Sequence, residues 1–462
     1  MNTVALQDAC NFLDDWLEYQ FKQTNLVGLS IAIHHKGSIV LSKTLGYADL
    51  SKKTALAPNH LFNIGSQSKM MTATAIMQLV EKGQVDLTDR AAKYLPWLSR
   101  HRDPQVAAVT IDQLLSHRAG IVRDGLEANF WQLEEEFPNE SRLETLVLKS
   151  SVVTGDLRYK YSNIGYALLG LIIEKMSGVT YADYSTTHII NPLDLRHLHP
   201  VFLPAFEEHI AKGYTRPIGG RRLSTPTNIP TLALSPAAGW YATAEAMCGF
   251  MAAQFSENDS LLAAENKEWL HTDHRTHWTS KERRGKEYGS GFMIQNFGEG
   301  VGIGHVGSFI GHRSCSFYDP TLQVGVVVLA NAKDAPVTLI AKGIFSVLYY
   351  FLHNTTLPCG PETEKFNSRL MNLWATVQII ATSNKIVAAR LGEWLPLLGA
   401  EELEHVGVNT LRIAKADANA SAHEFVTFNY QDSKVVSVNY AGSILRPESR
   451  FYDWLKNNWP NS

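Results

Sequence analysis

The chain has 462 residues, of which 45% are hydrophobic and 19% are charged, so it can bury at least one large core and is expected to form two or three folding units. Its 42 basic and 45 acidic residues give a formal charge of −3, which argues against a nucleic-acid-binding protein. A mean hydropathy of −0.12, with no apolar run of about 18 residues, argues against a membrane span. The four scattered cysteines indicate neither a disulfide framework nor a cysteine-rich zinc site.

The start of the chain indicates a helix. It has neither the basic region nor the long apolar stretch that opens a secretory leader, and its apolar residues recur at helical spacing, at Phe12, Leu13, Trp16 and Leu17. We therefore expect an amphipathic helix here. If Met1 is the native start, we also expect a cytoplasmic protein.

Strand patterns occur in two places that are far apart, at residues 29–33 with 39–41 and at residues 314–318 with 324–329. Between them helical periodicity predominates, over residues 70–82, 111–116, 165–177 and 242–255. Strands at both extremes with helices between them predict an α+β fold. We expect one antiparallel sheet flanked by helices, with an inserted and mostly helical subdomain.

The proline- and glycine-containing segment 354–361 predicts a domain boundary. We expect a main, catalytic domain over residues 1–356 and a small C-terminal domain over residues 362–462. The sequence does not indicate the role of the second domain. Short alternating runs between 402 and 446 predict that this second domain is β-rich, after a helical piece around 366–375. The proline-rich segment 212–236 is expected to be a long loop.

The first motif that could carry chemistry is Ser66 with Lys69, at the start of the helix predicted over 70–82. Residues three apart lie on one side of a helix, so the amine of Lys69 can approach the hydroxyl of Ser66. Partial burial lowers the pKa of a lysine, and such an amine can help to deprotonate a serine for nucleophilic attack. The structural alternative is a helix cap made by Ser66 or Ser68, followed by a surface lysine.

The second motif is Tyr161, Ser162 and Asn163, just before another predicted helix. A phenol beside a cationic lysine can hold its proton loosely and act as a base on a serine, and the amide of Asn163 can donate to a substrate carbonyl and accept from a lysine. The alternative is again structural, with Ser162 or Asn163 as the helix cap and Tyr161 in the core.

The third motif is His305, Gly307 and Ser308, in a glycine-rich run ahead of the late strand pair. Gly307 would allow a substrate backbone to approach an edge strand, and the N–H of Ser308 could stabilise an oxyanion. His305 could bind the substrate or tune the lysine. The tripeptide His-Val-Gly recurs at 405–407 after an acidic stretch, so at least one copy has no such role, and the neighbouring glycines favour His305.

In this order and at this wide spacing, the three motifs resemble those of the serine β-lactamase and penicillin-binding-protein superfamily, whose signatures are S-x-x-K, then S-x-N or Y-x-N, then K-T-G or a relative. Tyrosine in the second motif and histidine in the third resemble the class C-like branch, which includes class C β-lactamases, DD-peptidases, D-aminopeptidases and esterases of this fold. The resemblance covers roughly residues 20–352 and implies a β-lactamase/transpeptidase-like fold.

The resemblance also implies a role for each matching residue. Ser66 would attack a carbonyl and form an acyl-enzyme, Lys69 and Tyr161 would share the general-base and general-acid work, and Asn163 would orient Lys69 and the substrate. The backbone N–H groups of Ser66 and Ser308 would form the oxyanion hole. No metal or organic cofactor would be needed. The substrate would be a small molecule or a short peptide, and the oligomeric state is left open.

Histidine in place of the K-T-G lysine changes the expected substrate. That lysine carries a permanent positive charge which attracts a carboxylate, whereas His305 is mostly neutral near pH 7 unless its surroundings raise its pKa. We therefore expect a D-stereospecific peptidase or amidase, or an esterase, in preference to a β-lactamase proper. His312 and Arg313, a few residues on, could restore the charge. A non-hydrolytic protein that binds penicillin or peptidoglycan fragments, and an acyltransferase, are the alternatives.

Three other features point to structure more than to function. Seventeen histidines raise the question of a metal site, but the three between 271 and 277 have Asp273 as their only nearby carboxylate, so surface histidines explain them better. The run 129–136, with its three consecutive glutamates, is expected on a solvated helix. Trp240 could equally line a substrate cleft or pack in the core.

Overall fold

The computed structural model describes residues 3–150, 159–272, 286–354, 360–382, 385–416 and 422–459. Contacts divide the chain into two compact units, which we call the sheet unit and the barrel unit. The sheet unit is Leu26–Ala341, and the barrel unit combines Met1–Asn25 with Lys342–Ser462. By contact, the helix α1 (Thr3–Thr24), which the sequence predicted, groups with the C-terminal part of the chain. The segment expected as a boundary, 354–361, lies mostly outside the described residues.

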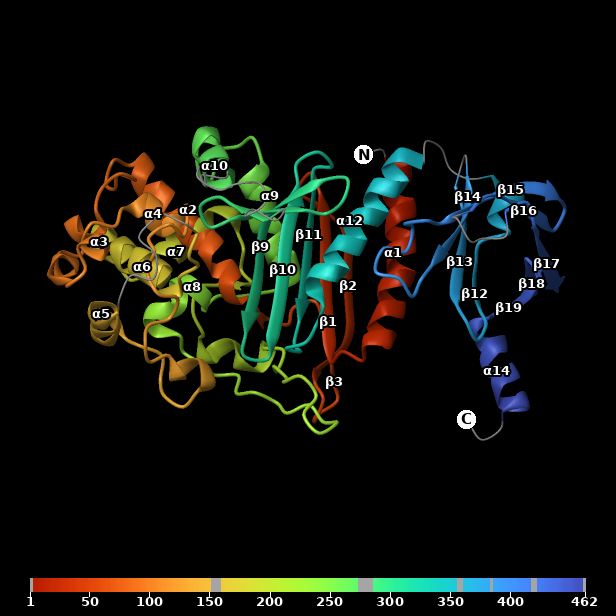
Figure 1. The fold of residues 1–462 in the computed structure, drawn as a ribbon, viewed down its shortest axis with the longest axis horizontal. Helices are drawn as coiled ribbons and strands as arrows, with labels where there is room; N and C mark the ends of the chain where they lie inside the picture. Colours follow the sequence, from red (N-terminus) through yellow and green to blue (C-terminus); the bar gives the residue numbers. More distant parts are fainter. Residues whose placement is uncertain are drawn as a thin grey trace. The chain divides into compact units, whose positions relative to one another are not determined.

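An eight-stranded antiparallel sheet forms the centre of the sheet unit (Figure 1). In spatial order its strands are β3 (Thr54–Ala55), β2 (Ser38–Asp49), β1 (Gly28–His35), β11 (Val324–Ala330), β10 (His312–Asp319), β9 (Val301–Phe309), β8 (Met293–Asn296) and β7 (Lys286–Tyr288). The strands β1 and β11 come from opposite ends of this unit and are neighbours, with Leu29 opposite Ala330. The expected single antiparallel sheet is therefore confirmed, and both predicted strand pairs are adjacent strands within it.

The sequence of each strand explains its place in the sheet. All seven residues of β11 are buried, and β1 is buried except at its last residue. Runs rich in valine and isoleucine pack well on both faces of a central strand. By contrast, β2 lies toward the edge and is mostly exposed or half-buried. The helix α9 (Ala244–Phe255) packs on the central strands β1, β10 and β11.

The other helices of the sheet unit lie together at one side of the sheet (Figure 1). They are α2 (Ser68–Glu81), α3 (Pro104–Ala107), α4 (Ile111–Leu115), α5 (Glu140–Lys149), α6 (Asn163–Ser177), α7 (Tyr181–Ser185), α8 (Ser235–Ala238) and α10 (Ala264–His271). The predicted helices correspond to α2, α4, α6 and α9. The three-stranded sheet β4 (Phe62–Asn63), β6 (Tyr241–Ala242) and β5 (Leu198–His199) completes this unit.

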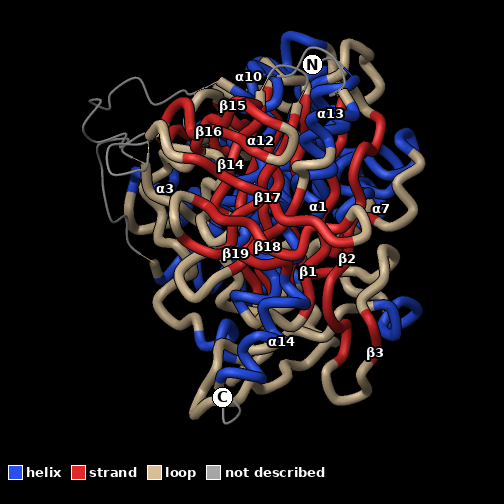
Figure 2. Tube along the Cα trace, turned by 90° about the vertical axis from the view of Figure 1, so that its right-hand side faces the viewer, coloured by secondary structure: helices blue, strands red, loops and turns tan. Residues whose placement is uncertain are grey.

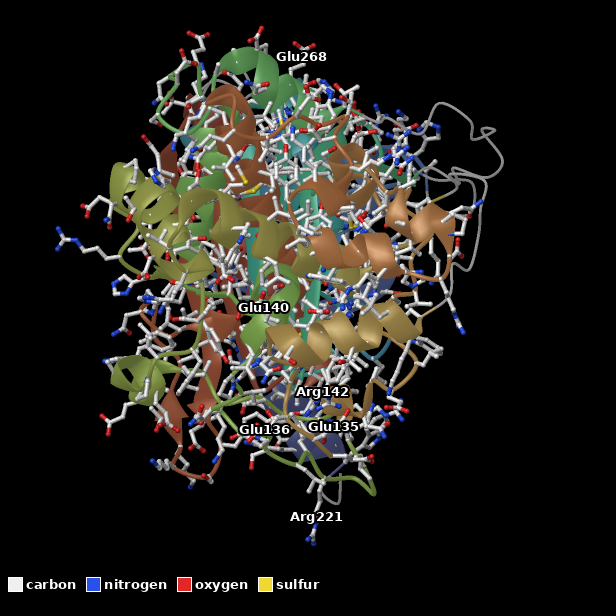
Figure 3. The ribbon with its side chains drawn as sticks, turned by 90° about the vertical axis from the view of Figure 1, so that its left-hand side faces the viewer. Glu135, Glu136, Glu140, Arg142, Arg221 and Glu268 are labelled. Atoms are coloured by element: carbon white, nitrogen blue, oxygen red, sulfur yellow. The ribbon has the colours of Figure 1, made fainter. Side chains whose placement is uncertain are left out.

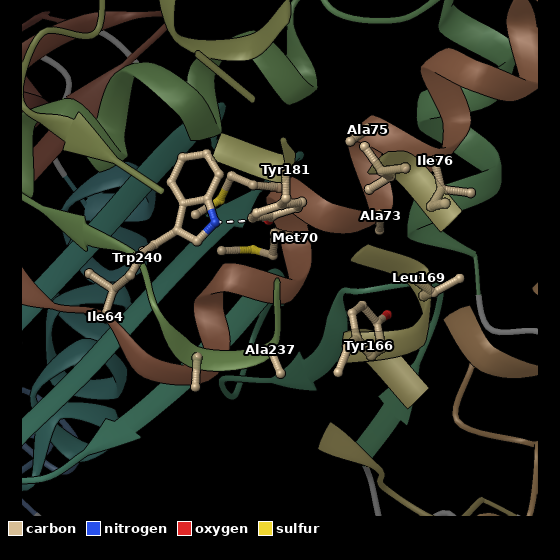
Figure 4. Close-up of a cluster of buried hydrophobic side chains, with 14 of the residues drawn as sticks. Ile64, Met70, Ala73, Ala75, Ile76, Tyr166, Leu169, Tyr181, Ala237 and Trp240 are labelled. Carbon is tan, nitrogen blue, oxygen red and sulfur yellow. Dashed lines mark hydrogen bonds between the residues drawn. The ribbon is translucent and has the colours of Figure 1, made fainter. Parts of the chain in front are cut away.

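A continuous core holds α2 and α6 in place. Met70 of α2 and Leu169 of α6 are fully buried within it, and so is Tyr166 (Figure 4). Trp240 packs in the same cluster and donates its indole N–H to the hydroxyl of Tyr181 at 2.9 Å. Because α2 follows the first motif and α6 follows the second, this core fixes the two motifs relative to one another. The segment 212–236 is irregular as far as residue 231, as expected of a long loop.

The barrel unit contains a closed barrel of eight antiparallel strands, each paired with the next along the chain (Figure 2). Its strands are β12 (Ser368–Met371), β13 (Thr376–Ala381), β14 (Ile386–Arg390), β15 (Glu401–Gly407), β16 (Thr410–Lys415), β17 (Phe425–Gln431), β18 (Lys434–Tyr440) and β19 (Ser443–Pro447). This confirms the expected β-rich C-terminal domain, including the turn between residues 431 and 434. The helices α13 (Pro361–Glu364) and α14 (Glu448–Asn458) flank the barrel in the sequence, and α12 (Val337–Asn354) crosses the division between the units.

The helical piece expected around 366–375 is wrong, because this segment forms β12 and a turn. Phe366 and Leu370 have helical spacing, but both are fully buried in the core of the barrel. The turn is fixed by Asn372, whose side-chain oxygen accepts the N–H groups of Trp374 and Ala375 at 2.8 and 2.9 Å. Within the described part of the chain, no helix is both long enough and apolar enough to cross a bilayer.

Candidate active site

Ser66 lies on a short turn that leads into α2. The turn is the 3-10 helix η1 (Gly65–Gln67), and Ser66 is partly exposed. Ser68, by contrast, is buried, donates its hydroxyl to the carbonyl of Gly65 at 2.7 Å and accepts the N–H of Trp240 at 3.1 Å. The residue that caps α2 is Gln67, and its side chain makes no cap hydrogen bond. Neither serine is the helix cap that was the structural alternative for this motif.

The amine of Lys69 is buried and lies near three oxygen atoms. Its Nζ is 2.8 Å from Oδ1 of Asn163, 2.7 Å from the carbonyl oxygen of Ala237 and 3.4 Å from Oγ of Ser66. The other end of the Asn163 amide donates to Asp124 at 2.6 Å, which orients its oxygen toward the lysine. The structure therefore brings Ser66 and Lys69 of the first motif together with Asn163 of the second.

Burial decides the charge of this amine. Desolvation lowers the pKa of Lys69 well below its usual range, a change that the carboxylate of Asp124 opposes and the guanidinium of Arg123 reinforces. A neutral amine has two N–H groups and one lone pair. The two short contacts of Nζ are with oxygens that can only accept, so in the neutral amine they take both N–H groups and leave the lone pair for the hydroxyl of Ser66, whereas the protonated amine donates to that hydroxyl as well. In this state Lys69 can take the proton of Ser66.

Tyr161 contacts the same hydroxyl but holds its own proton tightly. Its phenol forms a hydrogen bond with Ser66, and its ring centroid lies 4.8 Å from Nζ of Lys69. Burial raises the pKa of Tyr161, and the hydrogen bond with Ser66 offsets only part of that rise. The expectation of a loosely held proton is therefore wrong, and Tyr161 is a neutral phenol at pH 7. The cap of α6 is Ser162, which accepts the N–H of Gly165 at 2.9 Å.

Aromatic rings behind Lys69 explain why this region is desolvated. The ring of His117 lies 4.3 Å from that of Tyr161, 5.0 Å from Tyr166 and 4.9 Å from Tyr288, measured between centroids. Nζ of Lys69 is 5.5 Å from the centroid of Tyr166. Burial lowers the pKa of His117 well below its usual range, so its imidazole is neutral. This apolar wall removes water from one side of the amine.

His305 lies on β9, in the same buried region. Its ring centroid is 6.4 Å from that of Tyr161, its Nε2 is 3.3 Å from the hydroxyl of Tyr288, and its Nδ1 is 2.5 Å from the carbonyl oxygen of Val306. Burial is the main cause that lowers the pKa of His305, to about 3. The histidine of the third motif is therefore neutral at physiological pH. The other copy, His-Val-Gly at 405–407, lies on β15 of the barrel unit with an exposed histidine.

Two glycines let β9 pass directly against the turn that carries the nucleophile candidate. A Cβ on Gly307 would lie 1.9 Å from the carbonyl oxygen of Ile64, and a Cβ on Gly65 would lie 2.7 Å from the backbone nitrogen of Ser308. The described pairing of β9 with β8 ends at Gly304, so the rest of β9 is a local sheet edge, as expected. The space beside Gly307 is filled by the protein itself, which differs from the expected approach of a substrate backbone.

A lysine outside the three motifs lies at the end of β9. Lys333 follows β11, and its Nζ donates to the hydroxyl of Ser308 at 2.6 Å and to the carbonyl of Phe309 at 3.4 Å. Arg313 is opposite Ser308 in the register of β9 and β10. Burial lowers the pKa of Lys333, and the nearby charges of Arg313 and Arg123 lower it further. Lys333 thus contacts Ser308 directly, and Arg313 and Arg123 lie near enough to Lys333 to affect its pKa.

His312 does not contribute to that charge, contrary to one expectation. It is buried, its Nε2 lies 2.7 Å from the carbonyl oxygen of Ala211, and burial lowers its pKa to about 4. The three motifs include neither Lys333 nor Asp124, and Asp124 belongs to no recognisable pattern. For Lys333 a pattern was available, because a cation directly after the last central strand lies at the same edge of the sheet as the start of β10.

The remaining candidates have structural explanations. Among the described residues, no group of three or more His, Cys, Asp or Glu side chains could hold a metal ion. Of the histidines between 271 and 277 only His271 is described, and it stacks on Phe255 with centroids 4.3 Å apart instead of lying free on the surface. Residues 129–132 form a short 3-10 helix, but the glutamates after it lie outside any helix, and Glu135 pairs with Arg142 at 2.6 Å (Figure 3). Trp240 packs in the core.

The chain is similar to known proteins in both sequence and structure. The family model described as Beta-lactamase matches residues 13–348. Protein flp from Staphylococcus aureus (strain MW2) is 27% identical over 337 residues, which are 71% of this chain and 64% of that protein. The match therefore spans less than two thirds of the length of this curated relative.

Solved structures share the fold. The octameric penicillin-binding protein homologue from Pyrococcus abyssi aligns with a TM-score of 0.65 at 24% identity, covering 94% of this chain and 99% of that chain. The D-amino acid amidase from Ochrobactrum anthropi SV3, complexed with D-phenylalanine, aligns with a TM-score of 0.63 at 21% identity, covering 75% of this chain and 98% of that chain. The resemblance inferred from the three motifs is thus confirmed. Since the family model covers most of the chain, the protein belongs to the beta-lactamase family and joins that family's fold to a separate C-terminal barrel.

Proposed function

We propose that the protein is a serine acyl-hydrolase that works through an acyl-enzyme on Ser66. The oxygen of Ser66 attacks a substrate carbonyl while its proton passes to Lys69, and the bond to the leaving group breaks as that group takes the proton. A water molecule then attacks the acyl-enzyme ester and gives a proton to the same amine. Ser66 leaves with this proton, and the acid product is released. The N–H groups of Ser66 and Ser308 would stabilise the oxyanion in both steps.

The hydrogen bonding of Lys69 is the observation that carries this proposal. Its two N–H groups are taken by Asn163 and Ala237, and its pKa is lowered by burial, so its lone pair is available to Ser66 at the start of the reaction. Tyr161 is a neutral phenol in contact with Ser66, and it can pass the proton on to the leaving group. This division of work makes Lys69 the base and Tyr161 the proton donor.

The substrates that fit best are small amides, peptides or esters of D-amino acids. Neutral His305 favours a substrate without a carboxylate at that point. A cavity of about 480 Å³ is lined by Phe137 and Ile229 together with Glu135, Glu136 and other residues outside the three motifs. The ring of Phe137 stacks on that of Phe309, directly after Ser308, with centroids 6.1 Å apart. The likeness to a D-amino acid amidase supports this substrate class.

The basic side chains at Ser308 favour a second candidate function. Lys333 and Arg313 can attract a carboxylate placed next to the scissile carbonyl, as in a β-lactam. Under this candidate the protein is a β-lactamase, with the same nucleophile and base but a different recognition group.

A covalent label tests the nucleophile. After incubation with a fluorophosphonate or with penicillin, mass spectrometry of peptides should locate the adduct on Ser66. The adduct should disappear in Ser66→Ala and persist in Ser141→Ala, a matched control at an exposed serine of α5. The absence of any adduct with both reagents, or an adduct on another serine, would contradict the proposal.

A panel of chromogenic substrates separates the two candidates. Release of p-nitroaniline from D-alanine p-nitroanilide in preference to the L isomer would support a D-specific amidase, and p-nitrophenyl butyrate reports the esterase. Rapid turnover of nitrocefin that is lost in Lys333→Met would support the β-lactamase. The variant Ser66→Ala is the control throughout, since it should be inactive on every substrate.

A further inference from the structure

The barrel unit has a cavity of its own, where the apolar core of the barrel stops. On β14, Ile386 and Ala388 are buried in that core, and Arg390, two residues further on, lines the cavity. On β18, Val438 is buried and Tyr440 lines the cavity. Because side chains alternate along a strand, these cavity residues continue the inward-facing rows. The cavity is therefore the open end of the barrel interior.

On three more strands the inward-facing row also passes from a buried core residue to a residue that lines the cavity, at the same end of the barrel. Each pair has a cavity residue and a buried core residue two positions away: Val377 and Ile379 on β13, Glu401 and Leu403 on β15, Ser443 and Leu445 on β19. In an up-and-down barrel, the starts of alternate strands and the ends of the strands between them lie at one mouth. The cavity has a volume of about 490 Å³, and small-molecule sites commonly measure about 300–1,000 Å³. Eight-stranded barrels can hold one small ligand.

Side chains of both charge signs line this mouth. Glu401 accepts a hydrogen bond from the hydroxyl of Tyr440, and Glu393 also lines the cavity. Arg390 is exposed, and no described carboxylate forms an ion pair with it. Its guanidinium nevertheless lies near the same tyrosine, because its charge opposes the rise in the pKa of Tyr440 that burial and Glu401 cause. The cavity is thus lined by carboxylates and by a cation that forms no ion pair with a described carboxylate.

The rim carries an aromatic surface in a fixed position. The side chain of Trp374 is 92% exposed, on the turn that Asn372 holds by two backbone hydrogen bonds. Tyr19 of α1 lines the same mouth and donates its hydroxyl to Thr376 at 3.1 Å. A large exposed tryptophan beside a polar cavity is typical of a binding surface, because its ring offers contact area at a small cost in conformational entropy.

We propose that the mouth of the barrel binds a free α-amino acid with an aromatic side chain. The carboxylate of the ligand would pair with Arg390, its ammonium with Glu401 or Glu393, and its ring would pack on Trp374. A zwitterion satisfies both signs of charge at once, whereas an anion or a cation alone would leave one of them unpaired. The site belongs to the barrel unit and does not depend on hydrolysis at Ser66.

Calorimetric titration with D- and L-phenylalanine tests this site on the full chain carrying Ser66→Ala, which prevents turnover. Saturable binding is expected, and Arg390→Gln and Glu401→Gln should each weaken it about tenfold or more. Glu401→Gln keeps an acceptor for Tyr440, and Arg390→Lys keeps the charge and should retain part of the affinity. The matched control is Arg412→Gln, an exposed arginine on the outward side of β16, which should leave binding unchanged.

Three results would overturn the proposal. The first is equal affinity in Arg390→Gln and Arg412→Gln, with both variants unfolding at the same temperature as the parent. The second is binding of phenylacetate or phenethylamine as tight as that of phenylalanine, which would exclude recognition of a zwitterion. The third is the absence of any saturable heat with either isomer at millimolar concentration.

Discussion

Replacing Lys69 with methionine tests the charge of the buried amine through stability, without an activity assay. If Lys69 is the base, its amine is neutral in the folded protein, which agrees with the direction in which burial shifts its pKa, well below the usual range. In the unfolded chain the same lysine binds a proton at any pH below about 10.4. Unfolding therefore takes up one proton. The stability of the wild type rises with pH between the lowered pKa of the folded state and the usual pKa, whereas methionine has nothing to titrate.

The magnitude follows from this one-proton difference. The difference in unfolding free energy between the wild type and Lys69→Met should grow by about 1.4 kcal/mol for each pH unit, for example from pH 8 to pH 9. A pH-independent offset is expected as well. Methionine leaves the oxygens of Asn163 and Ala237 without their donor, which costs about 1–3 kcal/mol for each unsatisfied acceptor.

Urea unfolding of the full chain, followed by circular dichroism at several pH values, measures this difference. Lys175→Met, at an exposed lysine of α6, is the matched control and should differ from the wild type by the same amount at every pH. If the difference for Lys69→Met were equally constant from pH 7 to pH 9, the amine would be protonated in the folded protein. It could then not take the proton of Ser66, and the reasoning about the base would be refuted.

Three further predictions concern the third motif and Lys333, which contacts it. Lys333→Met should raise KM for nitrocefin about tenfold and leave p-nitrophenyl butyrate unaffected, since it removes a charge-assisted contact to a carboxylate; equal effects on both substrates would contradict a role in recognition. Gly307→Ala should destabilise the protein by about 1–3 kcal/mol and lower activity, because its Cβ would lie 1.9 Å from the carbonyl oxygen of Ile64, whereas Gly360→Ala meets no atom within 4 Å and is the control. Because the pKa of His305 is lowered to about 3, the pH profile of kcat/KM should show no step between pH 5 and pH 8 that vanishes in His305→Gln.

Much of the sheet unit was predictable because its elements carry local patterns. The buried valine-rich run of β11 and the capped helix α6 can be recognised from a few neighbouring residues each. The closure of the barrel was not predictable in this way. It depends on the pairing of β12 with β19, in which Leu370 lies opposite Pro447, and short alternating strands do not specify so distant a partner. A helix around 366–375 is not formed, although the spacing of Phe366 and Leu370 fits a helix as well as a turn followed by a strand.

The same distinction holds for the candidate site. The pairing of Ser66 with Lys69 could be predicted, since the two residues are three positions apart and such residues lie on one side of a helix. The state of the Tyr161 proton could not, because it depends on burial by His117 and by other rings that come from distant segments. Lys333 likewise reaches Ser308 only once β9, β10 and β11 are neighbours in the sheet.

The grouping of α1 with the barrel has a consequence for synthesis of the chain. Gln20 donates to the carbonyl of Leu391, 371 residues later, and Trp16 donates to the carbonyl of Glu393. At about 5–20 residues per second, a ribosome needs roughly 20–70 s to make the partners of this helix after the helix itself. During that interval the apolar face of α1 has no partner in its own unit, while the residues of the sheet unit, Leu26–Ala341, are all made before the interval ends. The sheet unit can therefore fold first. The barrel unit can be completed only after the whole of the sheet unit has been translated.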